Sequence, residues 1–153
     1  METISVLLRP SDIIKDDDMF QREGDAGILT AAQGYIELQG KTGEFLADAE
    51  DRLLSGSPGT IYLKRLGHRP LTAADLESLV MAKGTPEDKQ ALLAFTQAQT
   101  AIRDRLKTTK IIGTILEQAG ITRDLFYTRV KQPNLWKADE VIKVMTVLDR
   151  LQV

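Results

Sequence analysis

The four residues Ala119-Gly120-Ile121-Thr122 constrain the fold of this chain more than any other feature of its sequence. They combine a small residue, a glycine that can take the left-handed conformation, an apolar anchor and a hydroxyl that can cap a helix. A compact apolar face at helical spacing precedes them, formed by Ile111, Ile112, Ile115, Leu116 and Ala119. After them, Phe126 and Val130 form the inner face of a second helix from Arg123 to about Lys131. The pattern predicts two short helices joined by a tight turn.

A third helix is predicted to close this region. The sequence Gln132-Pro133-Asn134 ends the second helix, because the residue before a proline is disfavoured in the helical conformation. After Trp136, which we expect in the core, Asp139 and Glu140 lie where acidic groups favour a helix N-terminus. The inner residues of this helix are Val141, Val144 or Met145, Leu148 and Leu151.

Two short helices joined by a turn that contains glycine form the helix-turn-helix unit. Residues 111–148, in particular ILEQAGITRDLFYTRVKQPNLWKADEVIKVMTVL, resemble the helix-turn-helix of lambda-repressor/Cro-type DNA-binding domains. That family has a glycine-aliphatic-serine turn, a recognition helix, a loop with proline or asparagine, and a closing amphipathic helix. It commonly has an acidic residue and a glycine after the recognition helix, where this chain has Lys131-Gln132-Pro133. The Gly-Ile-Thr-Arg run is also similar to the recognition segment of tetracycline-repressor-type regulators, which lies near the N-terminus of longer chains.

The resemblance covers about a quarter of the chain and implies that the helix starting at Arg123 contacts DNA. With Phe126 and Val130 inward, helical geometry points Asp124, Tyr127, Thr128 and Lys131 outward and leaves Arg123 on the flank. The candidate DNA-binding residues are Thr122, Arg123, Asp124, Tyr127, Thr128, Arg129 and Lys131.

These residue types suit different parts of a duplex. Arg123, at the helix start, suits a bidentate contact with guanine, whereas Arg129 and Lys131 at its end suit the phosphate backbone, as does Thr122. Tyr127 suits a thymine methyl group or a phosphate. Asp124 repels phosphate, so it would accept a hydrogen bond from cytosine or hold Arg123.

Charge is distributed unevenly along the chain. The net charge is −2, but residues 1–102 hold ten Lys/Arg against sixteen Asp/Glu, a net −6. Residues 103–153 hold ten against six, a net +4. This asymmetry indicates either that the C-terminal third faces an anionic partner or that the chain has two solvated faces.

Composition excludes several classes of protein. The chain has no cysteine, which excludes disulfides, thiolate metal sites and a cysteine nucleophile. The single histidine, His68, argues against a histidine metal site or a Ser-His-Asp relay. No apolar run approaches the roughly 20 residues that cross a bilayer, and the first residues are too acidic for a signal peptide. We therefore expect a soluble cytoplasmic protein that is not an enzyme, with no cofactor, no metal, no membrane partner and no evident small-molecule ligand.

The first 105 residues resemble no family, but their pattern predicts helices. Apolar residues recur at helical spacing over 28–54, which predicts one helix of about 40 Å or, because glycines interrupt it, two shorter ones. Alternation over residues 3–9 and 60–66 predicts two short strands that could pair. Two capping boxes predict helix starts, Thr72 with Asp75 and Thr85 with Asp88.

The expected fold is mainly α, with a helical N-terminal region over 1–105, a possible two-stranded β element, and a helix-turn-helix module over 106–153. The expected function is DNA binding by a small transcriptional regulator or phage-type repressor. The alternative is an interaction or assembly protein that uses the same helices for protein contacts. If 28–54 is one helix, its apolar stripe around Tyr35, Leu38 and Phe45 exceeds what one helical pair covers, which predicts a homodimer.

Overall fold

The computed structural model describes the backbone of residues 10–152 and the side chains of residues 23–152. Within this part the chain forms eight α-helices and no strand. The helices are α1 (Pro10–Gln39), α2 (Thr42–Ala47), α3 (Pro58–Arg65), α4 (Ala73–Lys83), α5 (Pro86–Lys107), α6 (Ile112–Ala119), α7 (Arg123–Lys131) and α8 (Ala138–Leu151). Two short 3-10 turns lie between helices: η2 (Asp51–Leu53) between α2 and α3, and η3 (Pro133–Leu135) between α7 and α8. None of these helices is both long and apolar enough to cross a membrane.

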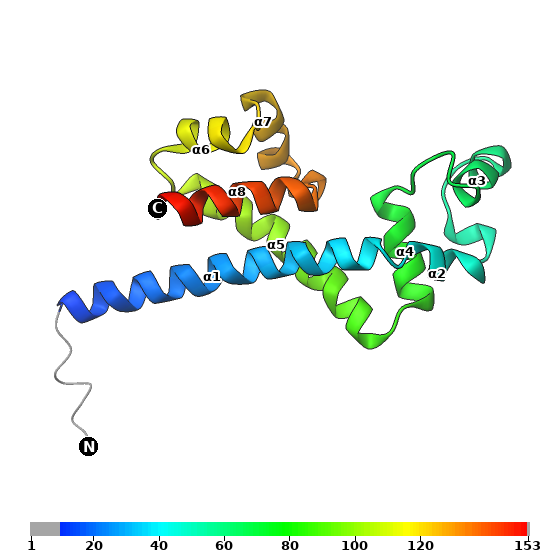
Figure 1. The fold of residues 1–153 in the computed structure, drawn as a ribbon, viewed down its shortest axis with the longest axis horizontal. Helices are drawn as coiled ribbons and strands as arrows, with labels where there is room; N and C mark the ends of the chain where they lie inside the picture. Colours follow the sequence, from blue (N-terminus) through cyan, green and yellow to red (C-terminus); the bar gives the residue numbers. More distant parts are fainter. Residues whose placement is uncertain (1–9, 153) are drawn as a thin grey trace, which may run out of the picture.

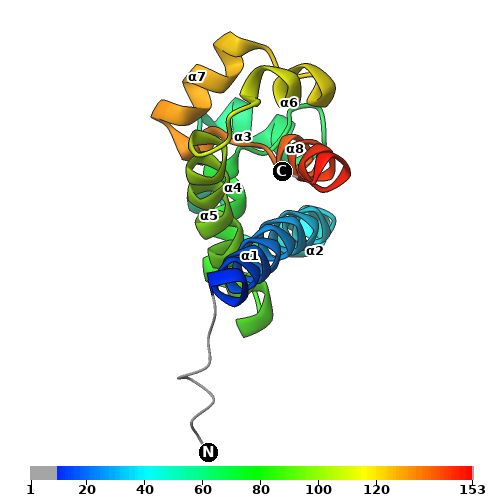
Figure 2. The same cartoon turned by 90° about the vertical axis from the view of Figure 1, so that its left-hand side faces the viewer.

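Helices α1, α5 and α8 form the centre of the molecule. Figure 1 shows α8 alongside α1 and running in the opposite direction, while α5 crosses α1 on its way back. One hydrophobic cluster includes Ala32 of α1, Ile102 of α5 and Val144 of α8, each with no exposed surface. This core does not divide near residue 105, because α8 shares it with α1 and α5. Figure 2 shows α6 and α7 at one end of this group of helices.

The predicted helix starts of α4 and α5 are confirmed. The Thr72 hydroxyl accepts the Asp75 amide at 3.1 Å, and the Asp75 carboxylate accepts the Thr72 amide at 2.9 Å. Thr85 and Asp88 exchange the same pair of hydrogen bonds at the start of α5. These contacts span three residues, so they form wherever the local sequence permits.

The predicted β element is not found among the described residues. Residues 60–66 belong mainly to helix α3, and residues 3–9 lie outside the part that the structure describes. The reason is a cap, since the Ser57 hydroxyl accepts the Thr60 amide and Pro58 takes the first helical position. The short alternation of Ile61 and Leu63 is too brief to compete with this start signal.

The apolar stripe over 28–54 is divided between two helices. Helix α1 ends at Gln39, and α2 begins at Thr42 after Gly40 and Lys41. Since glycine is less favourable than alanine inside a helix by up to about 1 kcal/mol, Gly40 favours a break at this point.

The argument for a covering second subunit is thereby removed. Tyr35, Leu38 and Phe45 are all at most 7 % exposed within one chain. The Tyr35 ring stacks on Phe95 of α5 with 4.0 Å between centroids. Other helices of the same chain cover this stripe, since α1 packs on α5 and α8 and α2 packs on α4.

Candidate nucleic-acid interface

The turn between α6 and α7 has the conformation that its sequence predicts. Gly120 has φ +73° and ψ +28°, a left-handed conformation that side chains with a Cβ rarely adopt. The Ile121 amide donates to the Leu116 carbonyl at 2.9 Å, and the Ile121 side chain is buried. The Thr122 hydroxyl accepts the Leu125 amide and starts α7. These contacts fix the angle at which α7 leaves α6.

Helix α7 is fixed to α8 by an ion pair that the sequence does not reveal. The Arg129 guanidinium donates from Nε and Nη2 to the two oxygens of Glu140, at 3.0 and 3.1 Å. Glu140 also accepts the Lys137 amide at the start of α8. A bidentate pair of this kind is stronger and more directional than a single charged hydrogen bond.

The predicted contact of Arg129 with the phosphate backbone does not fit this buried position. Arg129 is 7 % exposed, so its guanidinium is not free to reach a phosphate. Helical spacing offered a signal, because Arg129 follows Phe126 by three residues and so lies on its side of the helix. The partner, Glu140, is eleven residues away, and only the fold brings it there.

The other six predicted residues lie on the exposed surface, namely Thr122, Arg123, Asp124, Tyr127, Thr128 and Lys131. Tyr127 is 53 % exposed, and its ring lies 5.9 Å from that of Phe126, centroid to centroid. The Thr128 hydroxyl donates to the Asp124 carbonyl within the helix. The structure thus brings these six side chains together on α7 and at its start.

Two cations of this face have no ion-pair partner among the described side chains. Arg123 and Lys131 form no ion pair with any residue in the part of the chain that the structure describes. Arg123 lies over α6, because a Cβ added to Gly113 would stand 3.0 Å from its Nη2. With Asp124 as the third charge, the exposed face of α7 has a net charge of +1.

A second polar cluster, found only in the structure, lies between α3 and α4. Lys64 Nζ donates to Asp75 at 2.6 Å and to the Ser55 hydroxyl at 3.1 Å, and both charged side chains are at most 5 % exposed. Burial opposes ionisation of Asp75, but hydrogen bonds from Lys64, the Ser55 and Thr72 amides and the Ser55 hydroxyl hold its pKa far below the ordinary value. An ammonium ion paired with this carboxylate has no free lone pair to take a proton from Ser55. The cluster therefore attaches α3 to α4 and does not form a serine–lysine nucleophile.

Other kinds of site find no support in the described residues. No three His, Asp or Glu side chains in that part of the chain converge in a way that could hold a metal ion. No protein-family model, curated protein or solved structure matches this chain. The choice of the exposed face of α7 as the candidate site therefore depends on its geometry alone.

Proposed function

We propose that α6, the turn at Gly120 and α7 form a helix-turn-helix unit that binds double-stranded DNA through the exposed face of α7. The protein would then act as a small transcriptional regulator or a phage-type repressor. In such units the second helix enters the major groove with its N-terminal residues at the base edges. Here that end carries Arg123 and Asp124.

The observation that carries this proposal is the contrast between the two sides of α7. One side is held against α8 by the Arg129–Glu140 pair, while Arg123, Tyr127 and Lys131 on the other side are exposed. Because α7 is held against α8, it would lose little conformational freedom on binding DNA. Such a helix suits recognition of a rigid surface.

The two exposed cations would contact different parts of the DNA. Arg123, at the start of α7, has the planar fork that fits the O6 and N7 atoms of guanine. Lys131, at the end of α7, would contact phosphate and add affinity without sequence information. Thr122 and Thr128 carry hydroxyl groups that can donate to phosphate, and Tyr127 supplies a ring for a thymine methyl group.

A second candidate is that the same face binds a protein. Two features favour it: Tyr127 presents a large exposed ring, and Asp124 reduces the positive charge of the face. Tyrosine is enriched at protein interfaces, whereas an acidic residue at the start of a recognition helix repels phosphate.

The experiment that separates the two candidates is fluorescence anisotropy with a labelled random duplex at two salt concentrations. A DNA-binding protein should bind at low salt and lose affinity at high salt, because bound cations release condensed counterions from the duplex. The slope of log affinity against log salt should be small, in keeping with the few exposed cations on α7. Absence of any affinity at low salt would overturn the proposal in favour of protein contact.

A further inference from the structure

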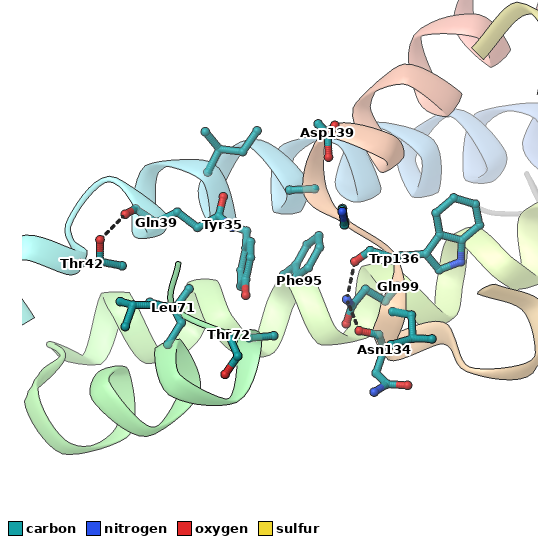
Figure 3. A pocket seen from close by; sticks show the side chains of 16 residues that line it. Tyr35, Gln39, Thr42, Leu71, Thr72, Phe95, Gln99, Asn134, Trp136 and Asp139 are labelled. Carbon is teal, nitrogen blue, oxygen red and sulfur yellow. Dashed lines mark hydrogen bonds between the residues drawn. The ribbon is translucent and has the colours of Figure 1, made fainter. Parts of the chain in front are cut away.

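A hollow of about 710 Å³ opens where α1, α4 and α5 meet the start of α8. We call it the α1–α4–α5 hollow. Figure 3 shows Tyr35 of α1, Leu71 and Thr72 before α4, and Phe95 of α5 around it. Asn134, Trp136 and Asp139 line its other end. Its volume lies within the range of roughly 300–1,000 Å³ that small-molecule sites occupy.

The walls of the hollow are largely apolar and partly uncovered. The stacked rings of Tyr35 and Phe95, with 21° between their planes, form one wall. At the edge, the apolar side chains of Ile36 and Leu135 are 41 % and 38 % exposed. Apolar surface gathered around a hollow is typical of a ligand site.

Three polar atoms of buried lining residues lack hydrogen-bond partners in the described part of the chain, and one of them, Trp136 Nε1, belongs to an indole that points away from the other labelled residues in Figure 3. Gln99 is 92 % buried, and its Nε2 donates both hydrogens, to the carbonyls of Trp136 at 2.8 Å and Asn134 at 3.2 Å. Its Oε1, an acceptor, has no hydrogen bond to any described residue. The Tyr35 hydroxyl also has none, and burial, aided by the charge of Glu77, raises its pKa, so it stays a donor. The hollow therefore offers one fixed acceptor and one donor.

The charge of the lining restricts the ligand further. The buried lining residues, including Leu76, Phe95 and Gln99, are uncharged, while Lys137 and Asp139 are exposed at the edge. A charged group placed against the inner wall would lose its hydration without gaining a counter-ion.

We propose that the α1–α4–α5 hollow is a binding site for an uncharged small molecule with a planar apolar ring and an amide or hydroxyl group. The ring would lie against the wall of Tyr35 and Phe95. The polar group would donate to Gln99 Oε1 and accept from the Tyr35 hydroxyl. This site is separate from the face of α7, and the proposal does not depend on DNA binding.

The test uses benzamide as the probe and benzoate as its charged counterpart of nearly the same shape. Titration into the ¹⁵N-labelled full chain, followed by ¹⁵N–¹H correlation spectra, should give saturable shifts at Ala73, Gln99 and Trp136 with benzamide. Benzoate should bind with an affinity at least tenfold weaker, as judged from the same titration. Equal binding of both probes, or no saturable shift at these residues with millimolar benzamide, would overturn the proposal.

Matched variants separate this site from adventitious binding. Ala73→Phe places a ring in the hollow from an exposed position at the start of α4, and Ala82→Phe adds the same ring near the far end of α4. Benzamide binding should be lost in Ala73→Phe and kept in Ala82→Phe. Tyr35→Phe keeps the stacked ring and removes only the hydroxyl, so it should weaken binding about three- to tenfold. Unchanged binding in both Ala73→Phe and Tyr35→Phe would show that the hollow is not the site.

Discussion

The Arg129 guanidinium lies against the Glu140 carboxylate with two parallel hydrogen bonds, Nε to Oε1 at 3.0 Å and Nη2 to Oε2 at 3.1 Å. The side chains are only 9 % and 12 % exposed, so solvent screens this pair much less than a surface pair. Because Glu140 also accepts the Lys137 amide, one carboxylate joins the last turn of α7 to the start of α8. The charge of Arg129 thus serves the fold, although its sequence position places it beside the exposed cations.

Replacing Arg129 with lysine should lower stability even though the charge is kept. Lysine lacks the planar fork, so Arg129→Lys loses one of the two charged hydrogen bonds. We expect the free energy of unfolding to fall by about 1.5–3 kcal/mol, measured by urea denaturation. The control is Arg103→Lys, since Arg103 pairs with the exposed Asp104 and should change stability by less than about 1 kcal/mol. Equal stability of the two variants would contradict the role given to the Arg129–Glu140 pair.

Lys131 and Arg123 should differ in how they affect DNA binding. Lys131→Ala should weaken binding about equally on all duplexes and lower the salt slope by about one unit. Arg123→Ala should cost roughly 1–3 kcal/mol on a preferred site, chosen by selection from random duplexes, and little on random DNA. The control is Lys89→Ala, which removes the same charge near the start of α5, on another helix than α7. It should leave the salt slope unchanged. A slope that fell equally in Lys89→Ala would argue against a localised contact on α7.

Gly113 allows a test of Arg123 that leaves its charge in place. A Cβ at residue 113 would lie 3.0 Å from Arg123 Nη2, the mobile end of a long side chain. Gly113→Ala should therefore leave the free energy of unfolding unchanged or raise it by up to about 1 kcal/mol, because alanine favours the helix. It should also displace the guanidinium and weaken binding to the preferred site more than to random DNA. A large loss of stability would show that Arg123 cannot move away from α6.

Removing the charge of Asp75 should be among the most damaging single substitutions in this chain. Asp75→Asn would leave the Lys64 ammonium buried without a counter-ion, since Lys64 is only 6 % exposed. We expect a loss of about 3–5 kcal/mol in the free energy of unfolding, measured with urea. Adding Lys64→Met to Asp75→Asn removes the unpaired charge and should restore part of this loss. No recovery in the double variant would mean that Asp75 acts through its cap of α4 alone.

Stability should also fall in acid. The hydrogen bonds that outweigh burial hold the pKa of Asp75 far below its ordinary value, so the unfolded chain takes up a proton at a higher pH than the folded chain does. Its contribution is therefore complete above about pH 4 and is lost as the pH falls through the folded pKa. Asp88, whose pKa is lowered by the Thr85 amide and by Lys41, acts in the same direction. Thermal melts between about pH 5 and about pH 2 should show a steep decline that is shallower in Asp75→Asn.

What the sequence by itself determined were the features that depend on neighbours within a few residues. The Thr72 and Thr85 caps, the left-handed Gly120 and the Thr122 cap each involve atoms at most four residues apart, so their residue types suffice to predict them. For the same reason the alternation over 60–66 was misleading, because the cap at Ser57 decided the local structure.

Only the tertiary structure decided which charged and polar groups are free to act. The burial of Arg129 depends on Glu140 eleven residues away, and that of Lys64 depends on Asp75 at the same separation. The partners of Gln99 lie 35 and 37 residues further along the chain. A residue type does not fix such separations, because the energy of a polar group depends on whether a partner or water surrounds it once the helices have packed.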